Sequence, residues 1–249
     1  DIAGILEGEV EYFHKKTTDM LFMKQVAPSL GYASYPVNDG ELVNQGVEFS
    51  LTAHLLNKKD YKFDFRVNGG YYKNEMTKMP IDETTGKEKA LELSTYYGWA
   101  KGHSLYDFYM REYAGVDPAN GDALFYKNTK NADGSIDRTK TNDYSEAERT
   151  VAGNPFPTLM AGLTNTINYK SLDFSFTFQG EWGASIYNSA GIYQSANGDF
   201  WDNQTVDQMN RWQKPGDITN VPQARYSRGN GTQASTRYLD GVDFIRLRN

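Results

Sequence analysis

Residues 46–72 contain two consecutive arms in which apolar and polar side chains alternate. A period of two places the members of each set on one face of a β-strand. A short polar turn, Asn57–Asp60, separates the arms, so we expect them to be antiparallel neighbours in a hairpin. The apolar face comprises Val47, Phe49, Leu51, Ala53 and Leu55 in the first arm and Tyr61, Phe63, Phe65 and Val67 in the second, whereas the polar face comprises Glu48, Ser50, Thr52, His54, Lys62, Asp64, Arg66 and Asn68.

Similar alternation predicts further strands on both sides of this hairpin. Residues 5–14 place Glu7, Glu9 and Glu11 on one face, and three carboxylates need water rather than a dry core. Residues 157–182 predict a second hairpin, and residues 103–126 predict two β-like arms around a turn at 115–121. In all, we expect strands of the main sheet near residues 4–14, 46–57, 61–72, 157–169, 171–182 and 237–249.

The connections between these strands differ at the two ends of the predicted sheet. Short turns near residues 58 and 170 join one end. The connections 15–45, 73–156 and 183–236 join the other end and are far longer than the usual connection of about 4–6 residues. This layout is typical of a transmembrane β-barrel with short periplasmic turns and long extracellular loops. We therefore predict an all-β, antiparallel barrel segment within one barrel domain.

Each face of the first hairpin has an expected environment in such a barrel. The outward face meets lipid and the inward face meets a polar lumen. The predicted lipid-facing residues are Val47, Phe49, Leu51, Phe63 and Phe65, and the predicted lumen-facing residues are Glu48, Thr52, His54, Asp64 and Arg66. A charge at the membrane midplane on the lipid face costs roughly 2–4 kcal/mol, and the outward sets of both hairpins contain none.

Composition narrows the class of protein further. The 249 residues carry a net charge of −6 with both signs interspersed, and without a basic stripe we expect no nucleic-acid partner. No cysteine is present, which excludes disulfides and thiolate metal sites within the chain. Mean hydropathy is −0.69, which alternating barrel strands tolerate. The 14% aromatic content and 23 glycines favour a β protein with long loops.

Several motifs, in order along the chain, carry a family resemblance. They are Asn44–Glu48 before a strand, the loop Tyr113–Tyr126 with the sequence YAGVDPANGDALFY, Asn154–Pro157 followed by GASIYN at 183–188, Asn210–Trp212 with Pro222, and the final residues 238–249. This set resembles SusC/RagA-type TonB-dependent outer-membrane transporters. Asn120 replaces a usual threonine, and Asp243–Ile245 replaces a usual Ser-Tyr-Leu. The similarity extends over nearly the whole chain.

The resemblance implies a function and partners. It implies that the chain is a fragment of the C-terminal half of a barrel in the bacterial outer membrane, without the family's N-terminal plug. It further implies import of oligosaccharides or peptides, a SusD-like surface lipoprotein over the extracellular loops, and a TonB complex that acts through the plug. No bond is made or broken in such transport, so we expect no enzyme activity, no cofactor and no metal.

Aromatic residues in the long connections are the candidates for ligand or lid contact. Their flat rings stack on sugars or pack on peptides, although loop packing is the simpler role for any one of them. The candidates are Tyr96, Tyr97, Trp99, Trp201 and Trp212.

Two alternative functions remain open from the sequence. One is a soluble extracellular β-domain that binds carbohydrate, in which the apolar faces form a sandwich core. The other is a β-rich glycoside hydrolase that uses acidic pairs such as Glu146 and Glu148. Detergent dependence separates the first alternative from a barrel. The three histidines, His14, His54 and His103, lack metal-ligand spacing, and the loops 117–122 and 131–137 lack the full calcium-binding pattern of an EF-hand.

Overall fold

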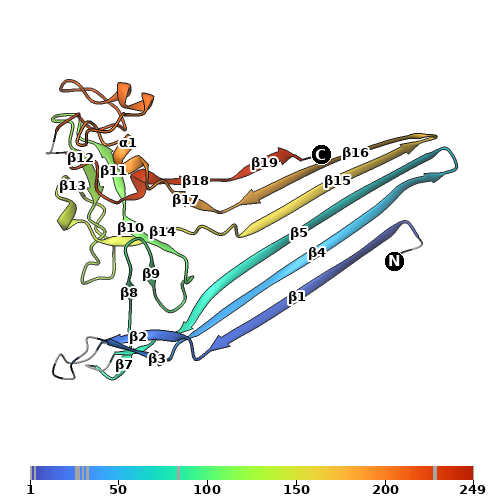
Figure 1. Cartoon of the computed structure of the whole chain (residues 1–249), viewed down its shortest axis with the longest axis horizontal. Helices are drawn as coiled ribbons and strands as arrows, with labels where there is room; N and C mark the ends of the chain where they lie inside the picture. The colour runs from blue at the N-terminus through green and yellow to red at the C-terminus, as the bar shows by residue number, and fades with distance from the viewer. Residues whose placement is uncertain are drawn as a thin grey trace.

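The computed structural model describes residues 2–248, except residues 3, 26–28, 30, 32–33, 83–84 and 227–228. A six-stranded antiparallel sheet runs through the molecule (Figure 1). In spatial order its strands are β1 (Leu6–Thr18), β4 (Glu41–Lys58), β5 (Tyr61–Lys78), β15 (Leu159–Tyr169), β16 (Leu172–Trp182) and β19 (Phe244–Leu247). The predicted all-β antiparallel class is confirmed.

Tight turns close one end of the sheet. Residues 59–60 join β4 to β5, and residues 170–171 join β15 to β16. Lys170 adopts a positive φ of 53°, and its backbone N–H donates to the carbonyl of Asp60 at 3.0 Å, so the two turns contact each other. Tyr61 and Tyr169 add a ring contact with centroids 4.6 Å apart.

Several strands differ in length from the sequence-based prediction. β4 begins at Glu41 rather than near 46, β5 continues to Lys78, and β1 continues to Thr18. These extensions are mostly polar and their few apolar residues, Leu42, Val43 and Met76, do not alternate, so apolar alternation does not reveal them. They pair in register nonetheless, and Asn74 donates to Asn44 across the strands at 2.6 Å.

The predicted final strand at 237–249 is wrong as one continuous element. The chain instead forms a 3-10 turn η4 (Thr236–Tyr238), a short strand β18 (Leu239–Gly241) and then β19. β18 pairs with β17 (Ser185–Tyr187), whereas β19 pairs with β16 in the main sheet. A three-residue strand and a four-residue strand therefore serve two different sheets, and residue 249 lies outside the described residues.

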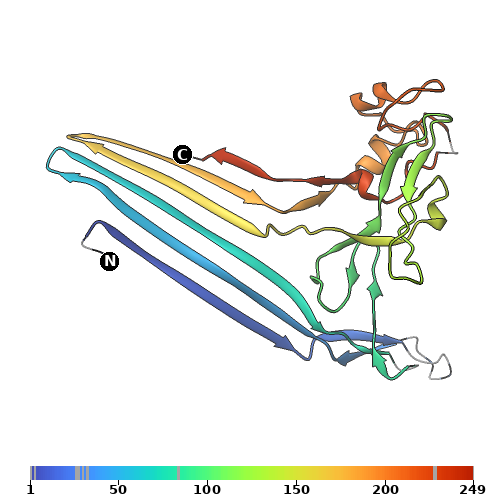
Figure 2. The same cartoon turned by 180° about the vertical axis from the view of Figure 1, so that it is seen from behind.

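The long connections fold into a loop body beyond the other end of the sheet (Figure 2). We use this name for the described residues 85–156 and 183–238. Its strands are β7 (Lys87–Glu88), β8 (Glu92–Leu93), β9 (Gly98–Trp99), β10 (Phe108–Arg111), β11 (Tyr113–Val116), β12 (Ala123–Tyr126), β13 (Lys140–Thr141), β14 (Arg149–Gly153) and β17, and its helical turns are η2 (Tyr144–Glu146), α1 (Gly191–Gln194), η3 (Val206–Asn210) and η4. The predicted turn at 115–121 joins β11 to β12, which pair antiparallel.

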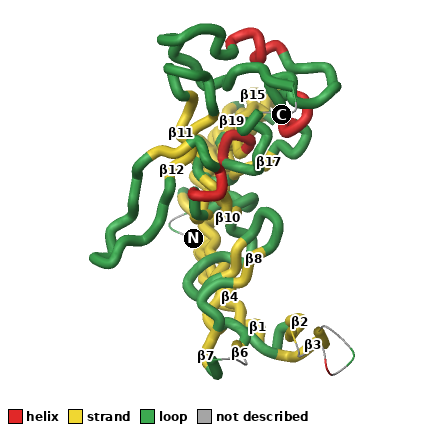
Figure 3. Tube along the Cα trace, turned by 90° about the vertical axis from the view of Figure 1, so that its left-hand side faces the viewer, coloured by secondary structure: helices red, strands yellow, loops and turns green. Residues whose placement is uncertain are grey.

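A separate hairpin stands beside the loop body. It consists of β2 (Leu21–Gln25) and β3 (Ser34–Asn38), and the two-residue strand β6 (Ile81–Asp82) pairs with β7 close by. Figure 3, seen from the loop side, shows β2, β3, β6 and β7 at one edge of the sheet and β11 and β12 toward the other edge, with β8 and β10 between them. None of the helices in the described residues is long and apolar enough to cross a membrane.

Burial follows this division of the molecule. The sheet is a single layer, whereas the loop body has small cores of its own. One contains Ala123, Phe125 and Ala147, and a second, at the junction with the sheet, contains Leu42, Met76 and Met79. A single layer leaves both faces of its sheet uncovered, so the chemistry of each face can be read directly from the strand register.

Candidate functional site

One face of the main sheet is polar over most of its length. Pairing places Glu48 opposite Gly70, Thr52 opposite Arg66, and His54 opposite Asp64, so the five residues predicted to line a lumen share this face. His54 Nδ1 lies 2.6 Å from Asp64 Oδ1, and the Arg66 guanidinium donates to the Ser50 hydroxyl at 3.2 Å. Neighbouring strands therefore connect their polar side chains across the face.

Strand β1 adds carboxylates to the same polar face. Glu11 lies directly opposite Glu48, and Glu9 lies opposite Ser50. Like charges directly opposite each other destabilise a sheet unless water or cations screen them. The Tyr72 hydroxyl donates to Glu48 at 3.0 Å. A hollow of about 450 Å³, lined by Glu9, Glu11, Glu48 and Arg66 among others, runs along this part of the face.

The opposite face of the sheet is an apolar band bounded by aromatic rows. At the loop end, Tyr12, Val47, Tyr71, Leu159 and Trp182 form one continuous row across five strands. At the turn end, Tyr61, Tyr169 and Leu172 form the corresponding row. Beyond the loop-end row the same face carries His14, Gln45 and Lys73, which lie opposite one another. The apolar band thus ends sharply where charged residues begin.

The band has the dimensions of a membrane core. β15 and β16 each cross it in 11 residues, which matches the ~9–11 residues that a tilted strand needs to span the hydrocarbon layer. Its large side chains, such as Phe49, Leu51 and Phe174, are exposed in this chain. Asn165 also lies on this face, opposite Phe65 and Phe176, but its side chain is buried. The apolar alternation of the sequence skips this residue.

Most of the predicted ligand-contact aromatics pack within the protein. Tyr96 contacts the Tyr187 ring with centroids 4.5 Å apart, and Tyr97 stacks on Phe108 at 5.1 Å. Trp99 packs on the junction core. Of the five candidates, Trp201 is the most open, with 89% of its surface exposed.

Trp212 is a correction to the predicted contact set. Its side chain is only 5% exposed, and its indole N–H donates to the carbonyl of Pro118 at 3.0 Å. Gly121 has a positive φ of 76°, and a Cβ atom there would lie 2.6 Å from the Trp212 ring. The Trp212 ring therefore packs against the 117–122 turn and has no free ring face for a ligand.

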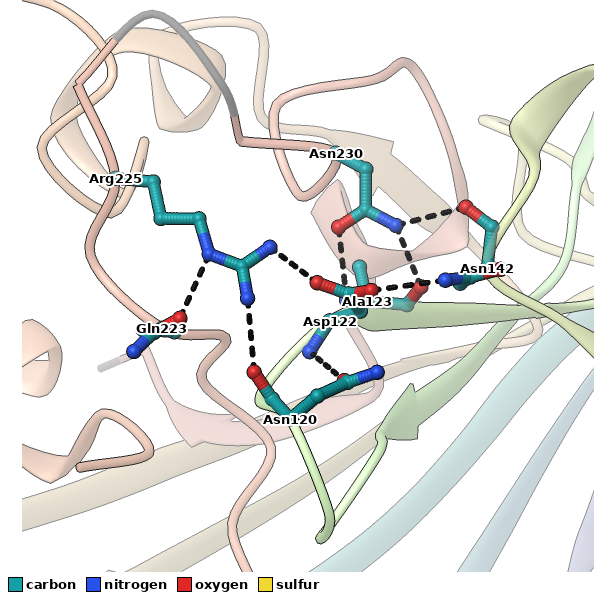
Figure 4. Close-up of polar contacts among 7 residues, drawn as sticks. All are labelled: Asn120, Asp122, Ala123, Asn142, Gln223, Arg225 and Asn230. Atoms are coloured by element: carbon teal, nitrogen blue, oxygen red, sulfur yellow. Dashed lines mark hydrogen bonds and ion pairs between the residues drawn. The ribbon is translucent and has the colours of Figure 1, made fainter. Parts of the chain in front are cut away.

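A polar network joins the same turn to the last loop (Figure 4). Arg225 forms an ion pair with Asp122 and donates to the carbonyl of Asn120 at 2.8 Å. Asn230 receives the N–H of Ala123 at 2.8 Å and donates to the carbonyl of Ala123 at 2.8 Å, as a neighbouring strand would. Two motifs about a hundred residues apart in the sequence are thereby fixed against each other.

A charged pair stabilises another edge of the loop body. Arg138 donates to both carboxylate oxygens of Glu112, at 2.6 and 2.8 Å, and its guanidinium lies 3.9 Å from the centre of the Tyr126 ring. The hydrogen bond from Arg138 lowers the pKa of Glu112 below its ordinary value of 4.5. Burial raises the pKa of Tyr113, in the adjacent strand, to about 12. These groups keep fixed charge states at neutral pH.

A larger hollow, which we call the mouth pocket, lies where the polar face meets the loop body. Its volume is about 710 Å³, within the range of ligand pockets. Its aromatic walls are Phe13 and Tyr72 from the sheet and Tyr106 and Phe156 from the loop body. The Phe13 and Tyr72 rings lie 6.1 Å apart, and those of Tyr106 and Phe156 meet edge to face at 4.7 Å.

Two hydrogen-bond centres, the partly buried Asn74 and the buried Asp107, hold the walls of the mouth pocket. Asn74 accepts from the Ser104 hydroxyl and from the Leu105 N–H, both at 2.9 Å. Asp107 accepts from the Ser104 N–H at 3.2 Å and from the Asn154 amide at 2.9 Å. The Asn74 bonds tie the sheet to the 104–105 segment and the Asp107 bonds tie that segment to Asn154, so the aromatic walls are preorganised.

Sequence reasoning missed the mouth pocket for a clear reason. Tyr106 and Phe156 are separated by about fifty residues, and the pairing of β10 with β14 and the contact between Asn154 and Asp107 bring them together. The one available signal was the run Asn154–Pro157, which places an aromatic residue between two prolines next to a strand. No group of three or more His, Asp or Glu side chains in the described ranges is placed to hold a metal ion.

Comparisons with known proteins show that the chain is similar to TonB-dependent receptors. No family model matches the chain. It is 28% identical over 258 residues to TonB-dependent receptor P3 of Formosa agariphila, an alignment that covers 98% of this chain and 25% of the relative. It is 25% identical over 194 residues to TonB-dependent receptor SusC of Bacteroides thetaiotaomicron, which covers 75% of this chain and 18% of that protein.

The chain is also similar to solved structures of a peptide transporter, RagAB, in both fold and sequence. The RagAB peptide transporter superposes with a TM-score of 0.78 at 26% identity, covering 98% of this chain and 26% of that one. The "open-open" state of the RagAB peptide importer gives a TM-score of 0.79 at 26% identity and covers 99% of this chain. The chain spans about a quarter of the length of the relatives it matches.

Proposed function

We propose, from the homology of this chain to TonB-dependent receptors, that it forms one wall of a barrel that imports large nutrients across the bacterial outer membrane. The carrying observation is the apolar band between two aromatic rows on one face of a single-layer sheet. In this proposal the band meets lipid, and the tyrosines and Trp182 lie at the two membrane–water interfaces, where aromatic residues gather in such barrels.

The polar face then lines the lumen of the barrel. Glu48, Thr52, His54, Asp64 and Arg66 share that face, and the carboxylates of β1 extend it. If these charged residues faced lipid instead, each would cost several kcal/mol. A lumen supplies the water that unpaired carboxylates need. The acidic hollow next to Glu48 fits a wet lumen for the same reason.

The loop body lies outside the cell in this proposal. The two tight turns mark the periplasmic end, so the connections 15–45, 73–156 and 183–236 are extracellular. A surface lipoprotein of the SusD kind would cover this side, and a TonB complex would act through a plug elsewhere in the protein. The substrate would be an oligosaccharide or a peptide, and no covalent bond would change. The neighbouring solved structures are described as a peptide transporter.

The exposed apolar band disfavours a soluble carbohydrate-binding domain. A sandwich needs a second sheet against that face. The residues described by the structure provide no such layer: Val10, Leu172 and Ile245 remain largely exposed. A stable soluble fold would have to bury this surface by other means.

Fractionation and uptake test the proposed function together. We expect the complete protein that carries this chain to reside in the outer membrane, to need detergent for extraction, and to be required for uptake of labelled oligomers that exceed the porin size limit. A complete protein that stays monomeric and folded in buffer without detergent would overturn the barrel. Unchanged uptake of every oligosaccharide and peptide after its deletion would overturn the transport role.

A further inference from the structure

We propose that the mouth pocket binds a bulky apolar side chain of an oligopeptide that carries positive charge. This inference rests on the proposed import function and chooses between its two substrate classes. It is argued from the chemistry of the pocket walls, the hydrogen-bonding state of the pocket's polar groups, and the charge along its floor.

The aromatic walls of the mouth pocket are open to a ligand. Tyr106 is 40% exposed and Phe156 is 56% exposed, although the pair is held in a fixed edge-to-face arrangement. Exposed aromatic rings on a rigid scaffold are the usual means of capturing an apolar group, because little side-chain entropy is lost when it binds. Phe13 and Tyr72 supply an opposing apolar surface from the sheet.

The Asn74, Asp107 and Asn154 side chains in the pocket walls are already occupied by bonds within the chain. Asn74 bonds Asn44 and two groups of the 104–105 segment. Asn154 donates to Asp107 and accepts from the Phe156 N–H at 2.8 Å. A sugar ring requires several directional partners for its hydroxyls, and burying it among occupied groups leaves those hydroxyls unpaired.

An apolar side chain has no such requirement. It gains from the area that it removes from water, and it leaves the hydrogen bonds of Asn74 and Asn154 intact. The pocket volume of about 710 Å³ accommodates such a side chain together with its neighbouring backbone. These walls therefore favour a peptide over an oligosaccharide.

The floor of the pocket continues into an acidic channel. The mouth pocket and the hollow beside Glu48 share Tyr72 and Met160 in their walls. Carboxylates outnumber cations along the two hollows: the acidic residues are Glu9, Glu11, Glu48, Asp107 and Glu181, and the basic residues are Arg66 and Lys73. Lys73 is itself paired with Glu75. A ligand amine or guanidinium on the residues that follow the apolar anchor would meet this acidic surface.

Binding measurements with defined peptides test the inference. The complete protein, purified in detergent, is titrated calorimetrically with a short peptide that contains lysines and one phenylalanine, with the same peptide carrying alanine in place of phenylalanine, and with a neutral malto-oligosaccharide. We expect the phenylalanine peptide to bind most tightly. Phe156→Ala should weaken that peptide about tenfold, equivalent to ~1.4 kcal/mol, and should leave the alanine peptide unchanged.

Three further variants keep the result interpretable. Phe156→Leu retains an apolar wall and should preserve most of the affinity, whereas Tyr226→Ala removes an exposed loop aromatic outside the pocket and should have no effect. Glu181→Gln should weaken the lysine peptides severalfold but not a peptide with glutamine in place of lysine. Circular dichroism and thermal unfolding confirm that each variant is folded.

Two results would overturn the inference while leaving import intact. One is a protein that imports peptides with unchanged affinity after Phe156→Ala. The other is a protein that binds the malto-oligosaccharide and loses that binding, but no peptide binding, in Phe156→Ala. Failure of import itself would appear instead as unchanged uptake after deletion of the gene, a separate readout that needs no pocket variant.

Discussion

Replacing Val67 by arginine places a charge at the middle of the proposed lipid face. The apolar band on β5 runs from Tyr61 to Tyr71, and Val67 lies one residue from its centre. Its cross-strand neighbours are Leu51 and Leu163, so an arginine there faces leucine directly on both adjacent strands, and the nearest polar side chain on this face, Asn165, lies diagonally on β15 and is buried. The adjacent residue, Asn68, points to the opposite face and provides a matched control.

The expected cost follows from the depth of the position. Arginine at the midplane of a barrel's lipid face costs roughly 2–4 kcal/mol, and the cost falls to about 0–1 kcal/mol near the interfaces. Val67→Arg should therefore lower the free energy of unfolding by roughly 2–4 kcal/mol, because Val67 lies close to the midplane. Asn68→Arg places the same charge beside the hollow that contains Glu9, Glu11 and Glu48, so it should change stability by less than about 1 kcal/mol.

Unfolding from lipid vesicles measures the difference. The complete protein and both variants are reconstituted, and urea unfolding is followed by intrinsic tryptophan fluorescence. We expect Val67→Arg to unfold at clearly lower urea concentration than Asn68→Arg, with a stability difference of about 2 kcal/mol or more. A third variant, Tyr71→Arg, lies in the aromatic row and should show an intermediate cost.

Equal stability of the two variants would refute the assignment of faces. A larger loss for Asn68→Arg than for Val67→Arg would reverse it, because the polar face would then be the one in contact with lipid. If both variants were folded and equally stable in buffer without lipid or detergent, the sheet would not be in contact with a membrane.

Three further predictions concern the loop body. Trp212→Ala should destabilise it by about 3–5 kcal/mol, whereas the exposed Trp201→Ala should change it by less than about 0.5 kcal/mol; limited proteolysis of the loops compares the two, and equal protection would contradict the packing of Trp212 on Pro118. The lowered pKa of Glu112 means that its pair with Arg138 contributes stability above pH 4.5 that is lost as the pH falls through the folded-state pKa. Glu112→Gln should therefore flatten the acid-induced rise in amide exchange of β10 to β14, and an unchanged pH profile would count against the pair. Asn230→Ala leaves the Ala123 backbone unpaired and should cost about 1–3 kcal/mol, seen as faster exchange at Ala123.

The sequence alone was sufficient to predict which residues lie on each face of the sheet. Strict alternation gives a strand one set of residues per face, and the turns at 59–60 and 170–171 are short enough to fix the neighbours. His54 and Asp64 therefore meet on the polar face as the pattern predicts. The irregular point was Leu55: a bulge between His54 and Leu56 shifts the register, and alternation alone cannot show an extra residue.

The packing of the loop body could not be predicted from the sequence because its contacts join residues that are far apart along the chain. Trp212 is buried by Pro118, which lies 94 positions earlier, and nothing near Trp212 in the sequence distinguishes it from the exposed Trp201. Tyr106 and Phe156 meet in the mouth pocket because β10 pairs with β14 and Asp107 bonds Asn154, and both contacts are long-range. Aromatic composition identified the right part of the chain, but tertiary packing decided which rings are free.

Site-directed spin labelling along β5 tests the central claim most directly. The chain contains no cysteine, so single cysteines at successive positions from Tyr61 to Tyr71 introduce labels without a background from these residues. In lipid vesicles we expect oxygen accessibility to peak at Phe63, Phe65 and Val67, and accessibility to a water-soluble nickel reagent to peak at the intervening positions. An accessibility pattern without a period of two, or one with the two reagents exchanged, would contradict a lipid-facing apolar band and a water-filled polar face.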